Sequence, residues 1–240
     1  MDYNSLKLSS YVDEFLVDNI NNMSCDFHDI SLNDMGCHIN QLQIDQYFPK
    51  HANLNYNYLK IDTVSKYSIT LPKKADTISE IIKKYCNISD RQIIITDATA
   101  GVGGNVLSFC KYNYYVNAIE IENERFNYLK HNINEYKFNG IVKLYNNDYI
   151  DIYDKLVQDV IFMDPPWGGM DYKKTEDITL KLGNLEIEDL CNLINDKKLA
   201  KLTVLKLPFN YNLNYIKRKI QQTFTIYRLK NILLVLIINN

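Results

Sequence analysis

The sequence has no long hydrophobic run and no strong charge of either sign. Its longest uninterrupted apolar stretch, residues 232–238, is far shorter than the roughly 20 residues that a bilayer-spanning helix needs. The 27 Lys and Arg residues nearly balance the 29 Asp and Glu residues, and the formal net charge of −2 excludes a strongly basic nucleic-acid coat. Residues 1–10 have no positive segment leading into an apolar one, so no secretory signal is expected. We therefore expect no membrane partner and an intracellular location, nuclear or cytoplasmic, or the host cytoplasm for a viral protein.

No CxxC pair is present among the five cysteines. This pattern is typical of free thiols in a reducing compartment. One cluster, formed by Cys25, His28, Cys37 and His38, could in principle supply zinc ligands. However, the adjacent Cys37 and His38 would both have to turn onto one metal, and the spacing matches no common structural zinc site. We therefore expect these four residues to have separate structural roles and to form no metal site.

The sequence also has no internal repeat and no Gly/Ser linker. The domain boundary is therefore placed where the predicted secondary structure changes along the chain. Residues 1–85 are predicted to form a mostly helical N-terminal extension, and residues 86–240 the core. In the core, short apolar strands alternate with helical segments, which predicts an α/β fold with a doubly wound, Rossmann-like sheet and ligands at the carboxyl ends of its strands. Strands are expected at residues 93–96, 116–121, 142–145, 160–163, 202–207, 224–229 and 232–238, the last two as an antiparallel pair. Helices are expected at residues 77–85, 105–112, 123–138, 185–194 and 213–220.

A glycine-rich turn follows the first predicted core strand. Its glycines let backbone N–H groups approach a ligand and open a helix whose positive end faces it. Alone, such a turn fits a nicotinamide dinucleotide site, another nucleoside site or simply a tight turn. Acids after the second and third strands can accept hydrogen bonds from ribose hydroxyls and from an adenine amino group, which favours a nucleoside ligand. The residues concerned are Asp97, Gly101, Gly103, Asn105, Glu120 and Asp148.

The fourth core strand runs into Asp164-Pro165-Pro166-Trp167, which combines an acceptor, a stiff turn and a large flat ring. Prolines lack a backbone donor, so the Asp164 carboxylate and the carbonyls form an acceptor-only rim that suits the exocyclic amino group of a nucleobase. Trp167 can stack on the base, which is worth ~1–3 kcal/mol. Hydrogen bonds to Asp164 and to the Pro165 carbonyl would align the amine with a methyl donor. The motif indicates amino-group methylation, and its structural alternative is a buried Trp after a proline turn.

Together these motifs resemble the trimethylguanosine synthase family, which methylates the amino group of 7-methylguanosine RNA caps with S-adenosylmethionine. The resemblance covers about residues 55–240 and is most specific in the glycine turn and in residues 165–169. It implies a class I methyltransferase, a 2,7-dimethyl- or 2,2,7-trimethylguanosine product, and 7-methylguanosine-capped RNA or a cap nucleotide as partner. We expect a monomer. The family resemblance also suggests that the first 50 or so residues form a lid over the bound cap.

The resemblance assigns roles to individual residues. Stacking of the positively charged 7-methylguanine on Trp167 adds a cation–π contribution of ~0.5–2 kcal/mol. The family usually has Ser where this chain has Asp164, and often Arg where it has Phe209, which leaves the triphosphate to Lys206, Lys173 or Lys174. The cofactor would be held by Asp97, Gly101, Gly103, Asn105, Glu120, Asp148 and Asp164. The catalytic residues would be Asp164, Pro165 and Trp167, and the substrate would contact Trp167, Pro166, Lys206 and Asn210.

Two other functions are compatible with the same residues. The first is methylation of guanine N2 or adenine N6 at internal positions of RNA or DNA, which uses the same acceptor rim. The second is a non-catalytic, methyltransferase-like subunit that binds RNA, although the intact glycine, acid and Pro-Pro-Trp positions count against it.

Overall fold

The computed structural model describes residues 41–86 and 90–240. Residues Cys25, His28, Cys37 and His38 lie outside the described residues, as does most of the predicted lid. No helix in the described ranges combines the length and apolar character needed to cross a membrane.

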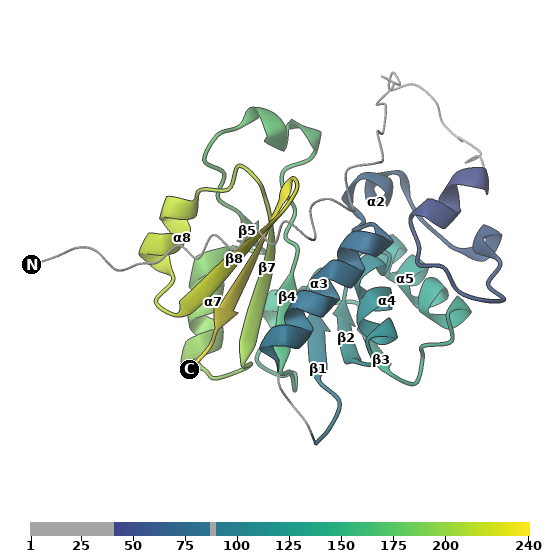
Figure 1. Cartoon of the computed structure of the whole chain (residues 1–240), viewed down its shortest axis with the longest axis horizontal. Coiled ribbons are helices and arrows are strands. Elements are labelled where there is room, and N and C mark those ends of the chain that lie inside the picture. Colours follow the sequence, from purple (N-terminus) through teal and green to yellow (C-terminus); the bar gives the residue numbers. More distant parts are fainter. Residues whose placement is uncertain (1–40, 87–89) are drawn as a thin grey trace, which may run out of the picture.

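A seven-stranded sheet forms the centre of the fold, in the order β3-β2-β1-β4-β7-β9-β8 (Figure 1). Its strands run parallel except for β9, which pairs antiparallel with both β7 and β8. Every strand predicted for the sheet is present within two residues of its expected ends, so the doubly wound architecture is confirmed. The strands are β1 (Ile94–Asp97), β2 (Tyr115–Ile119), β3 (Val142–Tyr145), β4 (Val160–Met163), β7 (Leu202–Pro208), β8 (Thr223–Leu229) and β9 (Ile232–Ile238).

Helices cover both faces of the sheet, because alternate strand residues point to opposite sides. In β4, Val160 and Phe162 belong to one hydrophobic cluster, while Ile161 and Met163 belong to the other. The first cluster also holds the apolar faces of α3 (Pro72–Tyr85), α4 (Gly104–Lys111) and α5 (Asn123–Glu135). The second holds those of α6 (Tyr149–Ile152), α7 (Ile187–Asp196) and α8 (Leu213–Lys219). The sheet is thus buried on both faces. Polar ligands can therefore approach it at the ends of its strands.

The described part of the N-terminal region packs on the same core as α3 to α5. It contains η1 (Gln41–Gln46), η2 (Tyr56–Tyr58) and α2 (Thr63–Ser68). Phe48 and Leu59 are buried in the first cluster. The Asn132 side chain of α5 accepts from the Lys60 N–H at 2.8 Å and donates to the Lys60 carbonyl at 2.9 Å. This segment is therefore fixed against the sheet, and the division at residue 85 stays a prediction.

Several local features differ from the predicted pattern. The helix α5 ends at Glu135 instead of residue 138, because Lys137 adopts a φ of 61° and the Phe138 N–H bonds the Ile133 carbonyl at 3.1 Å, as in a C-terminal cap. The expected start of α7 is instead a strand, since β6 (Leu185–Glu186) pairs with β5 (Lys181–Leu182). Helix α3 begins five residues earlier than predicted, at Pro72, where proline is well tolerated.

Candidate active site

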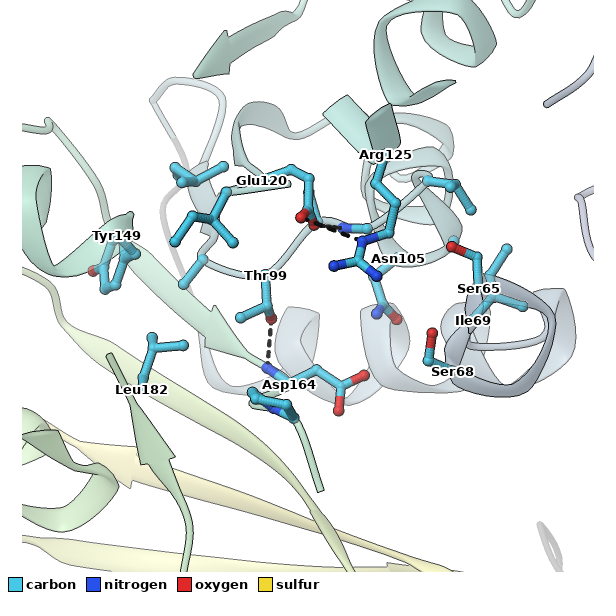
Figure 2. A pocket seen from close by; sticks show the side chains of 18 of the residues that line it. Ser65, Ser68, Ile69, Thr99, Asn105, Glu120, Arg125, Tyr149, Asp164 and Leu182 are labelled. Atoms are coloured by element: carbon cyan, nitrogen blue, oxygen red, sulfur yellow. Dashed lines mark hydrogen bonds and ion pairs between the residues drawn. The ribbon is translucent and has the colours of Figure 1, made fainter. Parts of the chain in front are cut away.

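A cavity of about 380 Å³ opens at the carboxyl ends of the central strands (Figure 2). Five of the residues predicted to hold a cofactor line it, namely Gly101, Asn105, Glu120, Asp148 and Asp164. The other two lie behind this wall. Asp97 is fully buried, and Gly103 has a φ of 106° with a Cβ position only 3.1 Å from Leu129 Cδ1. The structure thus brings five of the seven residues together around one cavity, and their role in holding a cofactor stays a prediction.

The glycine turn is held in place by Glu120 at the end of β2. The Gly101 N–H donates to Glu120 Oε2 at 2.9 Å, and the Glu122 N–H donates to Oε1 at 2.8 Å. Gly101 has a φ of 55°, which favours glycine. Arg125 Nε lies 3.5 Å from Glu120 Oε1. A carboxylate has about four lone-pair positions, so Glu120 retains acceptor capacity for the hydroxyls of a ribose.

Several residues of the cavity wall have a buried polar atom without a hydrogen-bond partner among the described residues, and two of them lie near Thr70. The Asn105 side-chain N–H donates to Thr70 Oγ1 at 3.1 Å, which leaves the buried Asn105 Oδ1 unpaired. The Ser65 hydroxyl is also buried without a partner. Unpaired buried polar groups are costly and usually indicate a missing ligand or water. These atoms fit a ligand that brings hydrogen-bond donors to this end of the cavity, as the amino-acid part of S-adenosylmethionine would.

Asp97, directly behind the turn, has a strongly perturbed acidity. Burial raises the pKa of Asp97 to about 8, a hydrogen bond from the Thr99 N–H lowers it, and the neighbouring Asp164 and Glu120 raise it further. Its Oδ2 has no hydrogen-bond partner in the part of the chain that the structure describes. The carboxyl therefore favours its protonated form at neutral pH. A positively charged ligand group nearby would favour the ionised form.

The buried Asp97 predicts a specific pH dependence of stability. Between about pH 4 and pH 8 the unfolded state releases this proton while the folded state keeps it, so folding stability falls as pH rises. Asp97→Asn has no proton to lose and can still accept from Thr99. We expect its stability relative to the wild type to increase by up to about 1.4 kcal/mol per pH unit in this range. Urea unfolding of both proteins across this range tests this, and parallel stability curves would contradict it.

The Asp164 carboxylate forms the end of the cavity nearest to Trp167. Its backbone N–H donates to Thr99 Oγ1 at 2.8 Å, and Lys206 Nζ donates to Asp164 Oδ2 at 2.5 Å. Burial raises the pKa of Asp164, and the charge and hydrogen bond of Lys206 act against this rise. Lys206 is only 4% exposed. One carboxylate oxygen is thus occupied by lysine, and Oδ1 is free of protein donors within the described residues and can accept a hydrogen bond.

Trp167 lies beside this ion pair without lining the cavity itself. The cavity wall ends at Pro166. Lys206 Nζ lies 5.2 Å from the centre of the Trp167 ring, and the Tyr172 ring meets the indole edge-on at 5.1 Å. The indole is half-buried, and its Nε1 has no partner. The structure therefore brings Asp164, Lys206 and Trp167 together at one corner.

Asn210, predicted to contact the substrate, binds the loop that follows Trp167. Its side-chain N–H groups donate to the Tyr172 carbonyl at 2.8 Å and to the Thr175 carbonyl at 2.5 Å. These bonds fix η3 (Met170–Lys174), which carries Tyr172. The geometry thus gives Asn210 a role in holding this loop, while its Oδ1 remains unpaired.

Two walls of the cavity were not predicted from the sequence. The first is α2 with the residues after it, which contributes Ser65, Ser68 and Thr70. The Asp62 side chain caps this helix by accepting from the Ser65 N–H, and such a capping residue was the available signal. The second is the β5–β6 hairpin, whose Leu182 and Gly183 contact the cavity. A two-residue strand has too little pattern to be recognised in a sequence.

The first of these walls depends on a close approach at Gly104, the first residue of α4. A Cβ there would lie 2.6 Å from Ile69 Cγ1 and 3.0 Å from the Thr70 carbonyl oxygen. We expect Gly104→Ala to push this segment outward and to destabilise the protein by ~1–3 kcal/mol, although alanine is the better helix former. Because Ile69 and Thr70 line the cavity, cofactor affinity should fall about tenfold, equivalent to about 1.4 kcal/mol.

The matched control for this prediction is Gly140→Ala. A Cβ at Gly140 meets no atom within 4 Å. We expect this variant to change stability by no more than about 0.5 kcal/mol and to leave cofactor binding as it is. Thermal unfolding and calorimetric titration with S-adenosylmethionine measure both quantities. If Gly104→Ala and Gly140→Ala had the same stability and the same cofactor affinity, the close approach at Gly104 would not be needed.

Comparisons with known proteins identify similar sequences and folds. A family model described as RNA cap guanine-N2 methyltransferase matches residues 92–236. The uncharacterized protein L320 of Acanthamoeba polyphaga mimivirus is 42% identical over 128 residues, covering 52% of this chain and 50% of that protein. The trimethylguanosine synthase of Schizosaccharomyces pombe is 30% identical over 136 residues, covering 51% and 55%. The chain thus spans about half the length of these curated relatives.

Solved structures share the fold at low sequence identity. The N-terminal domain of human METTL16 superposes with a TM-score of 0.51 at 17% identity, covering 76% of this chain and 73% of that one. A methyltransferase from Geobacter sulfurreducens superposes with a TM-score of 0.53 at 13% identity, covering 74% and 85%. At such identities the likeness concerns the fold alone, and it agrees with the strand order described above.

Proposed function

Because this chain belongs to the RNA cap guanine-N2 methyltransferase family, whose methyl donor is S-adenosylmethionine, we propose that it methylates the exocyclic N2 amino group of 7-methylguanosine RNA caps. The product would be 2,7-dimethyl- or 2,2,7-trimethylguanosine. The observation that carries the proposal is the corner where Asp164 closes the cavity beside Trp167. The similarity to the trimethylguanosine synthase of Schizosaccharomyces pombe also supports it.

The cofactor site is assigned from the walls of the cavity. Glu120 would accept the ribose hydroxyls, and Asp148 would accept from the adenine amino group. Asn105 and Ser65 would receive the donors of the amino-acid part, because their oxygens are unpaired. When bound, S-adenosylmethionine supplies an electrophilic methyl group on a positively charged sulfur. The chain's own residues position the acceptor amine next to it.

The acceptor rim provides the catalytic interaction with the base. Asp164 Oδ1 and the Pro165 carbonyl would accept the two N–H groups of the guanine amine, while Trp167 stacks on the ring. The nitrogen becomes positive as the new bond forms, so its hydrogen bond to a carboxylate strengthens in the transition state. Lys206 holds the other oxygen of Asp164 at 2.5 Å and thereby fixes the orientation of the carboxylate. Methyl transfer would be direct and in line, with no covalent enzyme intermediate.

The test is methylation of cap nucleotides with labelled S-adenosylmethionine. We expect 7-methyl-GTP to be labelled and unmethylated GTP to be spared, with mass spectrometry giving the number of methyl groups added. Equal labelling of the two nucleotides would contradict the cap assignment. No binding of S-adenosylmethionine in calorimetry would instead support the non-catalytic alternative.

Methylation at internal positions of RNA or DNA is the second candidate, and one observation favours it. The Asp164–Lys206 pair carries no net charge, so the corner offers no uncompensated acid to a positively charged purine. Recognition of the 7-methyl group would then depend on stacking with Trp167. Methylation of uncapped long RNA, with cap nucleotides ignored, would support this candidate. The monomeric state and the location of the protein stay predictions.

A further inference from the structure

Two lysines from distant parts of the chain lie at the same edge of the sheet as Asp164. Lys74 is in the first turn of α3, and Lys230 is in the turn between β8 and β9. Pairing of Pro208 with Ile232 brings this turn next to the carboxyl end of β7. Lys74 Nζ donates to Asn231 Oδ1 at 3.0 Å, which links the helix to the turn. We call Lys74, Lys230 and Asn231 the lysine rim.

The lysine rim has an excess of positive charge. Burial lowers the pKa of Lys74, and the positive charges of Lys206 and Lys230 lower it further, so the three ammonium groups are close enough to repel one another. Neither Lys74 nor Lys230 forms an ion pair with any carboxylate in residues 41–86 and 90–240. Lys206 is neutralised by Asp164, which leaves the rim lysines as the uncompensated charges. A bound anion would relieve this repulsion.

The rim is connected to Trp167 through a short chain of contacts. The Asn231 side chain is close enough to the Tyr172 hydroxyl to act against the rise in the pKa of Tyr172 that burial causes, and the Tyr172 ring lies edge-on to Trp167 at 5.1 Å. Lys206 lies on the face of β7 that carries Val204 and packs with α3, and its Nζ lies 5.2 Å from the centre of the Trp167 ring, which packs against the other cluster. The positive rim and the indole are therefore parts of one surface at the carboxyl edge of the sheet.

We propose that Lys74 and Lys230 bind the phosphate chain that leads away from a base stacked on Trp167. The proposal rests on the proposed function, since a cap nucleotide joins its base and ribose to a triphosphate. Lys74 uses one of its three N–H donors on Asn231, so two remain for phosphate oxygens. The exposed Phe209, at the end of the neighbouring strand β7, supplies no positive charge there.

The test compares a ligand with phosphates and one without. Trp167 is the sole tryptophan in the sequence, so quenching of its fluorescence reports binding beside it. Titrations use 7-methyl-GTP and the nucleoside 7-methylguanosine against the wild type, Lys74→Gln, Lys230→Gln and the double variant. Lys130→Gln, an exposed lysine of α5 on another part of the surface, is the matched control. Methylation of 7-methyl-GTP is measured in parallel to give KM and kcat.

We expect each rim variant to raise the Kd and KM for 7-methyl-GTP about tenfold and the double variant about a hundredfold, with kcat and nucleoside binding unchanged. The increase of Kd with salt should be weaker in each rim variant than in the wild type, because salt screens the attraction between lysine and phosphate. Equal KM for 7-methyl-GTP in the wild type and the double variant would overturn the lysine site and leave the proposed function intact. Wild-type protein that neither binds nor methylates 7-methyl-GTP would overturn both. Since Lys230 is exposed in a turn, Lys230→Gln provides the result if Lys74→Gln fails to fold.

Discussion

Asp164→Asn is expected to lower kcat for methyl transfer about a hundredfold or more, the loss seen when a hydrogen bond made to a developing charge is removed. In the wild type the carboxylate is an acceptor on both sides, since Lys206 Nζ donates to Oδ2 at 2.5 Å and the amine of the base would donate to Oδ1. An amide has a single oxygen. If that oxygen stays with Lys206, the amide N–H₂ group faces the N–H of the substrate, and two donors oppose each other.

This explanation makes a second variant informative. Lys206→Met in the Asp164→Asn background removes the competing donor, so the amide oxygen can turn toward the substrate amine. We expect the double variant to regain about tenfold in kcat over Asp164→Asn, a coupling of the kind that neighbouring residues show. Lys206→Met alone leaves a buried carboxylate without its partner, so it should unfold more readily than either.

Steady-state kinetics with 7-methyl-GTP measures these effects, and calorimetry with S-adenosylmethionine is the control. Asp164 is one of several residues in the cavity wall, so we expect cofactor affinity to fall less in Asp164→Asn than kcat does. A double variant no faster than Asp164→Asn would contradict the competition between Lys206 and the substrate. Full activity of Asp164→Asn would show that the carboxylate is not the catalytic acceptor.

Trp167→Ala is expected to raise KM for 7-methyl-GTP about tenfold to a hundredfold, because base–aromatic stacking is worth ~1–3 kcal/mol. The indole is held by Tyr172 on its edge and by Lys206 5.2 Å from its ring centre, so it is already oriented before a base arrives. A preordered ring loses little entropy on binding, so its removal costs most of the stacking energy.

Trp167→Phe is the matched variant. A phenyl ring keeps the contacts with Tyr172 and Lys206 and offers a smaller surface, so we expect KM to rise only about threefold to tenfold, the lower part of the stacking range. Thermal unfolding distinguishes lost stacking from lost packing. An unchanged KM in Trp167→Ala would mean that the base binds elsewhere, which would remove the main support for cap recognition.

The sheet and half of the site could be predicted because their signals are local. Val160–Met163 is a continuous apolar run that ends directly at Asp164, and Glu120 follows the second strand of the sheet. Parallel strands bring their carboxyl ends to one edge, so residues after each strand meet without further information. For this reason Gly101, Asn105 and Asp148 were correctly grouped with Glu120.

The remaining parts of the site depend on contacts between residues far apart in the chain. Ser65 reaches the cavity because α2 packs against Gly104, and Gly183 reaches it because the β5–β6 hairpin folds back on Asp148. The pairing of Lys206 with Asp164 also follows from the register of β4 and β7, which spacing in the sequence does not reveal. A lysine in an otherwise apolar strand was the only hint.

The position of β9 has a consequence for the order in which the molecule assembles. Among the described residues β8 pairs only with β9, which follows it in the chain, so β8 can join the sheet no earlier than β9 pairs with the open edge of β7. Pairing between distant segments is slow, and an unpaired edge invites association with other chains. The four parallel strands β1 to β4, with the nucleoside half of the site, can form earlier than the half containing Asn231.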